Sequence, residues 1–200
     1  YVAPGVTLTM GTGKMHLTLP AGARGDIQGV YTQSSSGTAK VFTCSGDLTI
    51  GANGFVDGPG EFLLTPTGTL RIGSVNGIVA GTVASGNIRV TGARTYDPAA
   101  AYIYNGTANQ VTGDGLPATL TNSLTINNPN TVTLSAARTI STGTLNLVNG
   151  TFATNNLLTL GNSATAANAT LNRSGGSMTG NLQGANWYTA VSYTHLRAHE

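Results

Sequence analysis

Short strand-like phrases that recur at a near-constant interval limit this chain more than any other feature. Leu48 and Leu70 lie 22 positions apart, and Leu124 and Leu145 lie 21 apart. A period of about 20 residues with several short strands per repeat is typical of a solenoid, in which each coil of chain stacks on the previous one. The phrases are variants or looser relatives of one another: GDLTIGANG (46–54), GTLRIGSVNG (68–77), NSLTINNPN (122–130), GTLNLVNG (143–150) and NNLLTLGNS (155–163).

Apolar residues alternate with Thr and other polar residues inside each run, and Gly, Asn, Ser or Pro bounds the runs. This alternation predicts strands with one buried face, and none of the runs has the spacing of a helix. The expected strands are VTLTM (6–10), HLTL (16–19), KVFTC (40–44), DLTI (47–50), EFLL (61–64), TLRI (69–72), NIRV (87–90), AYIY (101–104), SLTI (123–126), TVTL (131–134), TLNL (144–147), LLTL (157–160) and ATLN (169–172).

The predicted fold is all-β, a right-handed parallel β-helix, or β-solenoid, of short strands. One coil cannot bury its inward face, whereas stacked coils build a continuous column of Leu, Ile and Val. At about 22 residues per coil and roughly 4.8 Å between coils, about eight or nine coils are expected. Inward Thr and Asn at equivalent positions would form ladders along the rod. The alternative is an antiparallel β-sandwich array, because Asn-Gly at 53–54, 76–77, 105–106 and 149–150 suits hairpin turns.

The chain is nearly free of charge, and this narrows its partners. Charged residues make up 8% of the 200 residues, against roughly 25% in ordinary globular domains. A surface kept soluble by hydroxyls and amides is typical of extracellular β-structure, because Thr suits a pleated surface and Asn and Gly suit tight turns. The net charge of +2 is too small to indicate nucleic acid as a partner. No apolar run approaches the roughly 20 residues that span a bilayer.

The C-terminal stretch AVSYTHLRAHE (190–200) does not match what precedes it, because it concentrates charge and holds two of the three histidines. Residues 191–200 resemble a translated sequencing adapter of the transposase type. We therefore expect residues 1–189 to be a β-solenoid segment of a longer protein and residues 190–200 to be a non-native tail. On this interpretation His16 is the only native histidine, and the true termini lie elsewhere.

The middle of the chain carries a family resemblance. YIYNGTANQVTGDGLP (102–117), followed by SLTINN, VTLS and GTLNLVNG, resembles a recurrent module of large secreted surface proteins of Bacteroidetes. The resemblance covers most of residues 40–189. It implies a long protein of β-solenoid or adhesin-like repeats, exported by type IX secretion and located outside the cell or on the outer-membrane surface. Extracellular glycans, or the surface of a host or neighbouring cell, are the partners that it implies.

The carboxylates give little support to catalysis. Glycoside hydrolysis needs two carboxylates held at a defined distance, and Asp57 and Glu61 in FVDGPGEF are the nearest pair in sequence. Asp-Gly-Pro-Gly predicts a turn instead, with the aspartate capping its own backbone. Asp47 in SGDLTI and Asp114 in TGDGLP are also expected in turns.

Arginines and tyrosines provide two further candidate clusters. Arg71, Arg89 and Arg94 would line one face of adjacent coils in a polysaccharide lyase, although outward arginines of a solenoid are more often only solvated. The tyrosines at 96, 102 and 104 would stack on sugar rings if exposed. The alternation of Tyr102 and Tyr104 on one strand face favours packing in the core.

Cys44 and His16 are the remaining reactive side chains. Cys44 has apolar neighbours and no basic group beside it, which predicts an inert core thiol, and His16 is expected to be structural or exposed. We expect no catalytic, cofactor-binding or metal-binding residue, no cofactor, and no enzyme activity. The alternative is a carbohydrate-active or carbohydrate-binding β-helix module, similar to a polysaccharide lyase or hydrolase.

Overall fold

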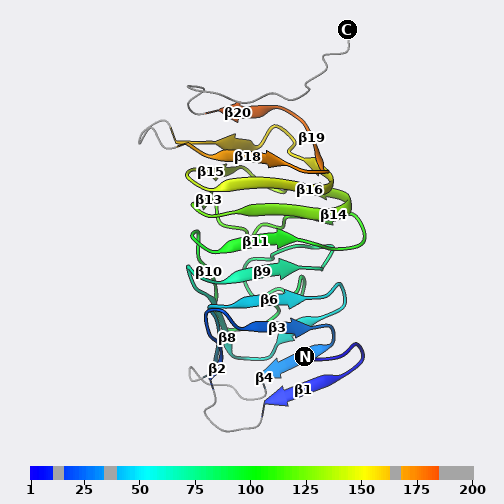
Figure 1. Ribbon diagram of the computed structural model, residues 1–200. Coiled ribbons are helices and arrows are strands. Elements are labelled where there is room, and N and C mark those ends of the chain that lie inside the picture. Colours follow the sequence, from blue (N-terminus) through cyan, green and yellow to red (C-terminus); the bar gives the residue numbers. More distant parts are fainter. Residues whose placement is uncertain (11–15, 34–39, 163–167, 185–200) are drawn as a thin grey trace.

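The computed structural model describes residues 1–10, 16–33, 40–162 and 168–184, and over these ranges the chain forms a parallel β-solenoid of about seven turns (Figure 1). The strand pairs between these residues are all parallel, so the solenoid is confirmed and the antiparallel sandwich is wrong. The expected adapter-derived tail, 190–200, lies outside the described residues.

Each coil contributes strands to the walls of the rod, and each wall is a parallel sheet that runs along it. A three-stranded sheet contains β1 (Thr7–Met10), β4 (Val30–Gln33) and β7 (Phe55–Asp57). A four-stranded sheet contains β2 (Leu17–Leu19), β5 (Val41–Cys44), β8 (Glu61–Leu64) and β10 (Arg94–Tyr96). A second four-stranded sheet contains β13 (Thr119–Leu120), β15 (Arg138–Ile140), β17 (Leu158–Leu160) and β20 (Leu182–Gly184).

The longest wall is a nine-stranded sheet that extends from the first coil to the last in Figure 1. Its main strands are β3 (Arg24–Ile27), β6 (Asp47–Ile50), β9 (Thr69–Ile72), β11 (Ala101–Tyr104), β14 (Leu124–Thr133), β16 (Thr144–Ala153) and β18 (Thr170–Arg173). Two further strands pair with the second halves of β14 and β16, namely β12 (Gln110–Val111) and β19 (Ser177–Thr179). The first and second halves of the long strands β14 and β16 therefore pair with different short strands.

Inward side chains stack in register along the nine-stranded sheet. Leu48 aligns with Leu70, which is followed by Tyr102, Leu124 and Leu145. Each of these five side chains is no more than 1% exposed, because the strands alternate between buried and half-buried positions. Removal of so much apolar surface from water is the main force that stabilises the stack.

The coils are not of equal length. The interval between aligned residues is 22 from Leu48 to Leu70, 32 from Leu70 to Tyr102, and 22 from Tyr102 to Leu124. The longer interval contains residues 73–93, which form a loop between β9 and β10. The estimate of eight or nine coils was therefore too high, because it assumed one constant period.

A second stack inside the rod is aromatic. Ring centroids are 5.5 Å apart from Tyr31 to Phe42, 5.6 Å from Phe42 to Phe62, and 6.0 Å from Phe62 to Tyr96. The first two pairs meet edge to face, a geometry that aromatic rings prefer. The sequence phrases did not reveal this stack, since its members come from strands of different composition.

Buried amides stabilise one corner of the rod. Gln110 donates to the carbonyls of Ile72 and Ser74, and it accepts a 2.7 Å hydrogen bond from Asn128 of a neighbouring coil. Both amide side chains are at most 2% exposed. The pair provides partners for backbone groups that the turn leaves free. It joins a glutamine to an asparagine at non-equivalent positions, so it is not the expected inward ladder of Thr and Asn.

The loop 73–93 is held against the wall by polar contacts. The Arg94 guanidinium donates to the carbonyls of Val79, Val83 and Val90. Residues 87–90, predicted as a strand, form only an isolated bridge from Ile88 to Val56. The prediction of a strand was wrong, because the NIRV segment has the alternation of a strand but pairs with a neighbouring strand at only this one residue.

Candidate functional site

The outer surface of the nine-stranded sheet carries two shallow depressions, one toward each end of the rod. The first, here called the charged patch, is lined by four charged residues and three uncharged ones: Arg24, Asp26, Asp47 and Arg71, with Tyr1, Gly25 and Thr49. The second, here called the amide groove, is lined by polar and aliphatic side chains of the last coils: Thr125, Asn146, Leu147, Val148, Asn172, Arg173 and Ser174.

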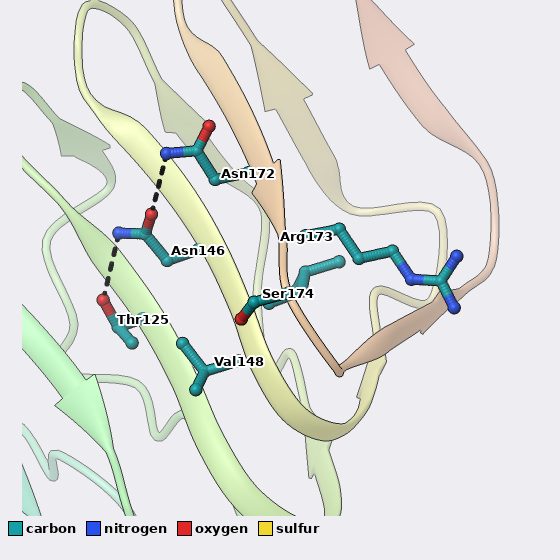
Figure 2. A pocket seen from close by; sticks show the side chains of 7 residues that line it. Thr125, Asn146, Val148, Asn172, Arg173 and Ser174 are labelled. Atoms are coloured by element: carbon teal, nitrogen blue, oxygen red, sulfur yellow. Dashed lines mark hydrogen bonds between the residues drawn. The ribbon is translucent and has the colours of Figure 1, made fainter. Parts of the chain in front are cut away.

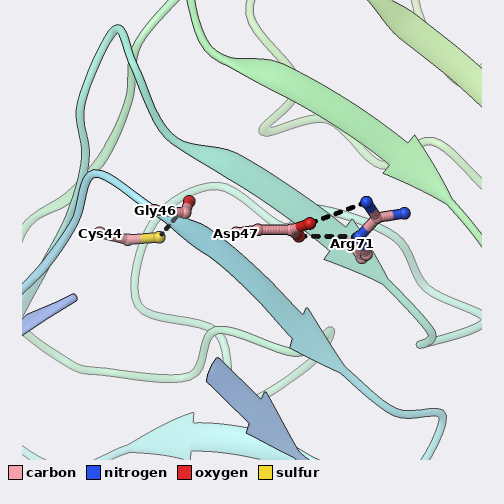
Figure 3. A network of polar contacts seen from close by, with 4 residues as sticks. All are labelled: Cys44, Gly46, Asp47 and Arg71. Carbon is pink, nitrogen blue, oxygen red and sulfur yellow. Dashed lines mark hydrogen bonds and ion pairs between the residues drawn. The ribbon is translucent and has the colours of Figure 1, made fainter. Parts of the chain in front are cut away.

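Asp47 and Arg71 form the centre of the charged patch. Arg71 Nε lies 2.7 Å from Asp47 Oδ1, and its Nη2 lies 2.8 Å from Oδ2 (Figure 3). The hydrogen bonds from Arg71 hold the pKa of Asp47 below its ordinary value, assisted by the positive charges of Arg71 and Arg24 and opposed by partial burial. Each oxygen of this carboxylate therefore accepts a hydrogen bond from Arg71, and the lowered pKa keeps the group ionised.

Asp26 is the second carboxylate of the patch. It lies on the coil before Asp47, and its Oδ1 accepts a 2.6 Å hydrogen bond from Gln28 Nε2. The patch thus brings two carboxylates and two guanidinium groups to one depression. A glycosidase needs one carboxyl with a raised pKa to act as general acid. The pKa of Asp47 is shifted in the opposite direction, so Asp47 does not suit the role of general acid.

The predicted pair, Asp57 and Glu61, is not brought into one site. Asp57 ends β7 in the three-stranded sheet, and Glu61 begins β8 in a different sheet. The bend at 58–60 between them is confirmed, and Gly58 has a φ of +100°. Asp57 Oδ1 is buried and has no hydrogen-bond partner among the described residues, so this oxygen does not cap the turn as expected.

The other two predicted turn aspartates differ in outcome. Asp47 is the first residue of β6 rather than a turn residue. Asp114 does lie in a turn, where it accepts a 2.9 Å hydrogen bond from the backbone N–H of Ala80 and so fastens the loop 73–93 to the wall.

The arginines do not line one face. Arg71 is in the nine-stranded sheet, Arg94 is in a four-stranded sheet, and Arg89 lies with its guanidinium 4.0 Å from the centre of the Phe55 ring. The hypothesis of a lyase-like row of Arg71, Arg89 and Arg94 is therefore wrong. Arg94 is not merely solvated either, because three backbone carbonyls accept its hydrogen bonds.

The tyrosines are structural. Tyr102 and Tyr104 are fully buried, and their hydroxyls donate to the carbonyls of Asp97 and Thr112 at 2.6 Å in both cases. Tyr96 packs against the Phe62 ring, and its hydroxyl oxygen is buried without a partner among the described residues. Core packing is confirmed for Tyr102 and Tyr104, which excludes them as a platform for sugars.

Cys44 is fully buried, as predicted, and its thiol donates to the carbonyl of Gly46 at 3.5 Å (Figure 3). Burial raises the pKa of this thiol to about 12, so thiolate is scarce at neutral pH. His16 is exposed just before β2. In the described part of the chain, no group of three or more His, Cys, Asp or Glu side chains is placed to hold a metal ion.

The amide groove is built from a ladder across three coils. Asn146 Nδ2 donates to Thr125 Oγ1, and Asn172 Nδ2 donates to Asn146 Oδ1, each at 3.2 Å (Figure 2). The three residues are in register on β14, β16 and β18. Val148, 39% exposed, provides an apolar surface beside them. Arg173 lies at the edge, with its Nε donating to the Gly176 carbonyl.

Sequence reasoning missed both depressions. Asp47 and Arg71 are 24 positions apart and lie diagonally across two paired parallel strands. Their contact can therefore be predicted only when the register of β6 against β9 is known. The signal for the groove was present, because Thr125 and Asn146 follow Leu124 and Leu145, which have the 21-residue period.

Comparison with protein-family models, curated proteins and solved structures finds no match to this chain. No helix in the described ranges is long and apolar enough to cross a bilayer.

Proposed function

We propose that this chain is a structural, adhesin-like segment of a large bacterial cell-surface or secreted protein, and that it has no catalytic role. The observation that carries this proposal is the bidentate pair of Asp47 and Arg71, which neutralises the central carboxylate of the charged patch. A parallel stack of coils is well suited to a spacer, because each coil contacts only its neighbours and the rod can be extended by repetition.

The low charge supports the same proposal. Beyond Asp97, the described residues hold three ionisable side chains other than tyrosine, namely Asp114, Arg138 and Arg173. Arg138 is only 7% exposed and donates to the carbonyls of Ala137 and Asp114, so it serves the wall itself. A wall of hydroxyls and amides is hydrated without the help of charged side chains, so its interaction with water does not depend on the salt concentration as that of exposed charges does.

A second function, binding of extracellular glycan, is favoured by the amide groove. Asn172 Oδ1 accepts no hydrogen bond from the ladder, and each side-chain amide that donates within it keeps a second N–H. Sugar hydroxyls match such groups, and an apolar surface such as Val148 matches the C–H face of a sugar ring. This favours a module that binds carbohydrate over one that cleaves it.

A depolymerisation assay tests the structural proposal. The whole chain is incubated with a panel of neutral and uronic-acid polysaccharides, and new reducing ends and unsaturated products are measured. We expect neither product above the level of an Asp47→Asn, Asp26→Asn double variant. Cleavage by the natural chain that this variant loses would overturn the proposal and establish the charged patch as catalytic.

Affinity electrophoresis in neutral polysaccharides tests the second function. We expect retardation of the chain, and we expect Asn146→Ala to reduce the affinity about fivefold, since a buried or preorganised hydrogen bond contributes roughly 1 kcal/mol. Thr139→Ala, an outward threonine of another sheet, is the matched control and should migrate as the natural chain does. Equal retardation of all three proteins would exclude the groove as the binding site.

A further inference from the structure

The four Asn-Gly pairs of this chain are not equivalent in the structure. An Asn-Gly pair can modify itself, because the glycine nitrogen can attack the side-chain amide carbon of the preceding asparagine. Glycine has no side chain to hinder this approach. The folded chain determines which pair reaches that geometry.

Asn149 and Gly150 have the geometry that the reaction needs. The backbone N–H of Gly150 donates to Asn149 Oδ1 at 2.9 Å, which places the nitrogen beside the side-chain amide. Asn149 is exposed, so water and base reach it. Gly150 has a φ of +70°, at an irregularity of the β14–β16 register next to Asn127.

In the other three pairs the glycine N–H has a different acceptor. Gly54 donates to the Gly51 carbonyl at 3.1 Å, and Gly77 donates to the Ser74 carbonyl at 3.1 Å. Gly106 donates to Gln110 Oε1 at 3.0 Å within the buried corner. Each of these hydrogen bonds holds the amide proton and directs the nitrogen away from its own asparagine.

We propose that Asn149 is a site of self-catalysed deamidation, the preferred one among the four Asn-Gly pairs of the folded chain. Base removes the Gly150 amide proton, and the resulting electron pair lies where the N–H bond pointed, toward the Asn149 amide. The nitrogen bonds to Cγ, and the Cγ–Nδ2 bond breaks as the leaving nitrogen takes a proton and departs as ammonia. Water then opens the succinimide ring at one of its two carbonyls. Nothing is oxidised or reduced.

The products alter the outer wall in two ways. Opening at one carbonyl gives aspartate, which adds a negative charge to a region of the rod with few charges. Opening at the other gives isoaspartate, which inserts a methylene group into the backbone of β16. A Cβ on Gly150 would collide with the Asn128 carbonyl oxygen, so the backbone next to Asn149 is tightly packed against the neighbouring coil. This inference is independent of the function proposed above.

Peptide mass spectrometry of the whole chain tests the proposal. The folded protein is incubated at mildly alkaline pH, digested, and the amide-to-acid mass gain is followed at residues 53, 76, 105 and 149. We expect Asn149 to react about tenfold faster than the other three, or more, because its nitrogen is already positioned. In urea the four rates should converge, since only the shared local sequence then remains.

Two comparisons make the test decisive. Asn149→Gln should abolish the fast mass gain at this peptide and leave the other three rates unchanged, because glutamine must close a larger ring. Asn122, whose Oδ1 also accepts from the next backbone N–H, at 2.8 Å from Ser123, should react more slowly than Asn149 because serine carries a side chain. The proposal is overturned if another Asn-Gly pair reacts first in the folded protein, or if the order of rates is the same in urea.

Discussion

At the scale of single residues, the ion pair of Asp47 and Arg71 joins two neighbouring coils on the outer wall. Arg71 spans from one coil to the carboxylate of the coil before it, so the pair is a contact between neighbours along the rod. The side chains are 34% and 25% exposed, for Arg71 and Asp47 respectively. Such partly exposed pairs contribute at most about 1 kcal/mol to folding. The pair therefore determines local charge more than stability.

Asp47→Asn tests the linkage between this pair and pH. The pKa of Asp47 is lower in the folded chain than its ordinary 3.8, so its stabilisation is present above that value and is lost as pH falls through the lower folded pKa. Urea unfolding should show the variant less stable by up to about 1 kcal/mol at neutral pH, with the difference vanishing in strong acid. Thr69→Ala, which aligns with Asp47 and carries no charge, should show a pH-independent difference. A difference for Asp47→Asn that persists in acid contradicts this account.

Cys44 provides a second measurement at this scale. Because burial raises the pKa of its thiol to about 12, a thiol reagent added at mildly alkaline pH should label the unfolded chain rapidly and the folded chain only through unfolding. The labelling rate, followed against urea concentration, should rise in parallel with the unfolded fraction. Rapid labelling without urea would show that the thiol is accessible.

At the scale of the strand, alternation predicted much of the structure. DLTI, EFLL, TLRI and AYIY form strands with the expected bounds. β3 was missed because only one of its two inward positions, Ile27, is apolar. The other is Gly25, where a Cβ would lie 3.1 Å from a methyl carbon of Leu48. The large side chain of the next coil fills that space, so the pattern of β3 alone lacks the apolar signal. Whether such a glycine position is buried depends on the side chain that the neighbouring coil places over it.

The same limit explains the candidate sites. Alternation along one strand gave the burial of Tyr102 and Tyr104, because both positions belong to one run. The contact of Asp47 with Arg71 and the ladder of Asn146 depend on which residues align between coils. An insertion such as 73–93 changes that alignment for all later coils, so a constant period does not predict it.

Adjacent residues of β14 give a matched test of the two faces. Leu124 is fully buried in the column, and Thr125 lies half-buried on the outer wall. Leu124→Ala should lower the free energy of unfolding by about 2–5 kcal/mol, because it leaves a cavity. Thr125→Ala should cost about 1 kcal/mol or less, the contribution of one hydrogen bond. Comparable losses for the two variants, measured by urea unfolding, would contradict the assignment of inside and outside.

At the scale of the whole molecule, the account depends on coils that stack in a parallel register. The second four-stranded sheet brings Thr119 beside Thr139, and Thr139 beside Thr159. Neighbouring strands are about 4.8 Å apart, which suits a disulfide, whereas a separation of two strands does not. An antiparallel hairpin that aligned Thr139 with Thr159 would pair residue 138 with 160 and residue 140 with 158, whereas here Arg138 pairs with Leu158 and Ile140 with Leu160.

Cysteine cross-linking in a Cys44→Ala background measures this register most directly. Under mild oxidation, the Thr119→Cys, Thr139→Cys pair and the Thr139→Cys, Thr159→Cys pair should each form an intramolecular disulfide in high yield. The Thr119→Cys, Thr159→Cys pair, two coils apart, should not. On β14 and β16, the Thr131→Cys, Thr151→Cys pair and the Thr133→Cys, Ala153→Cys pair should both cross-link, because parallel strands keep both alignments. Cross-linking of only one of these two pairs, which is what antiparallel strands allow, would contradict the parallel stack of coils.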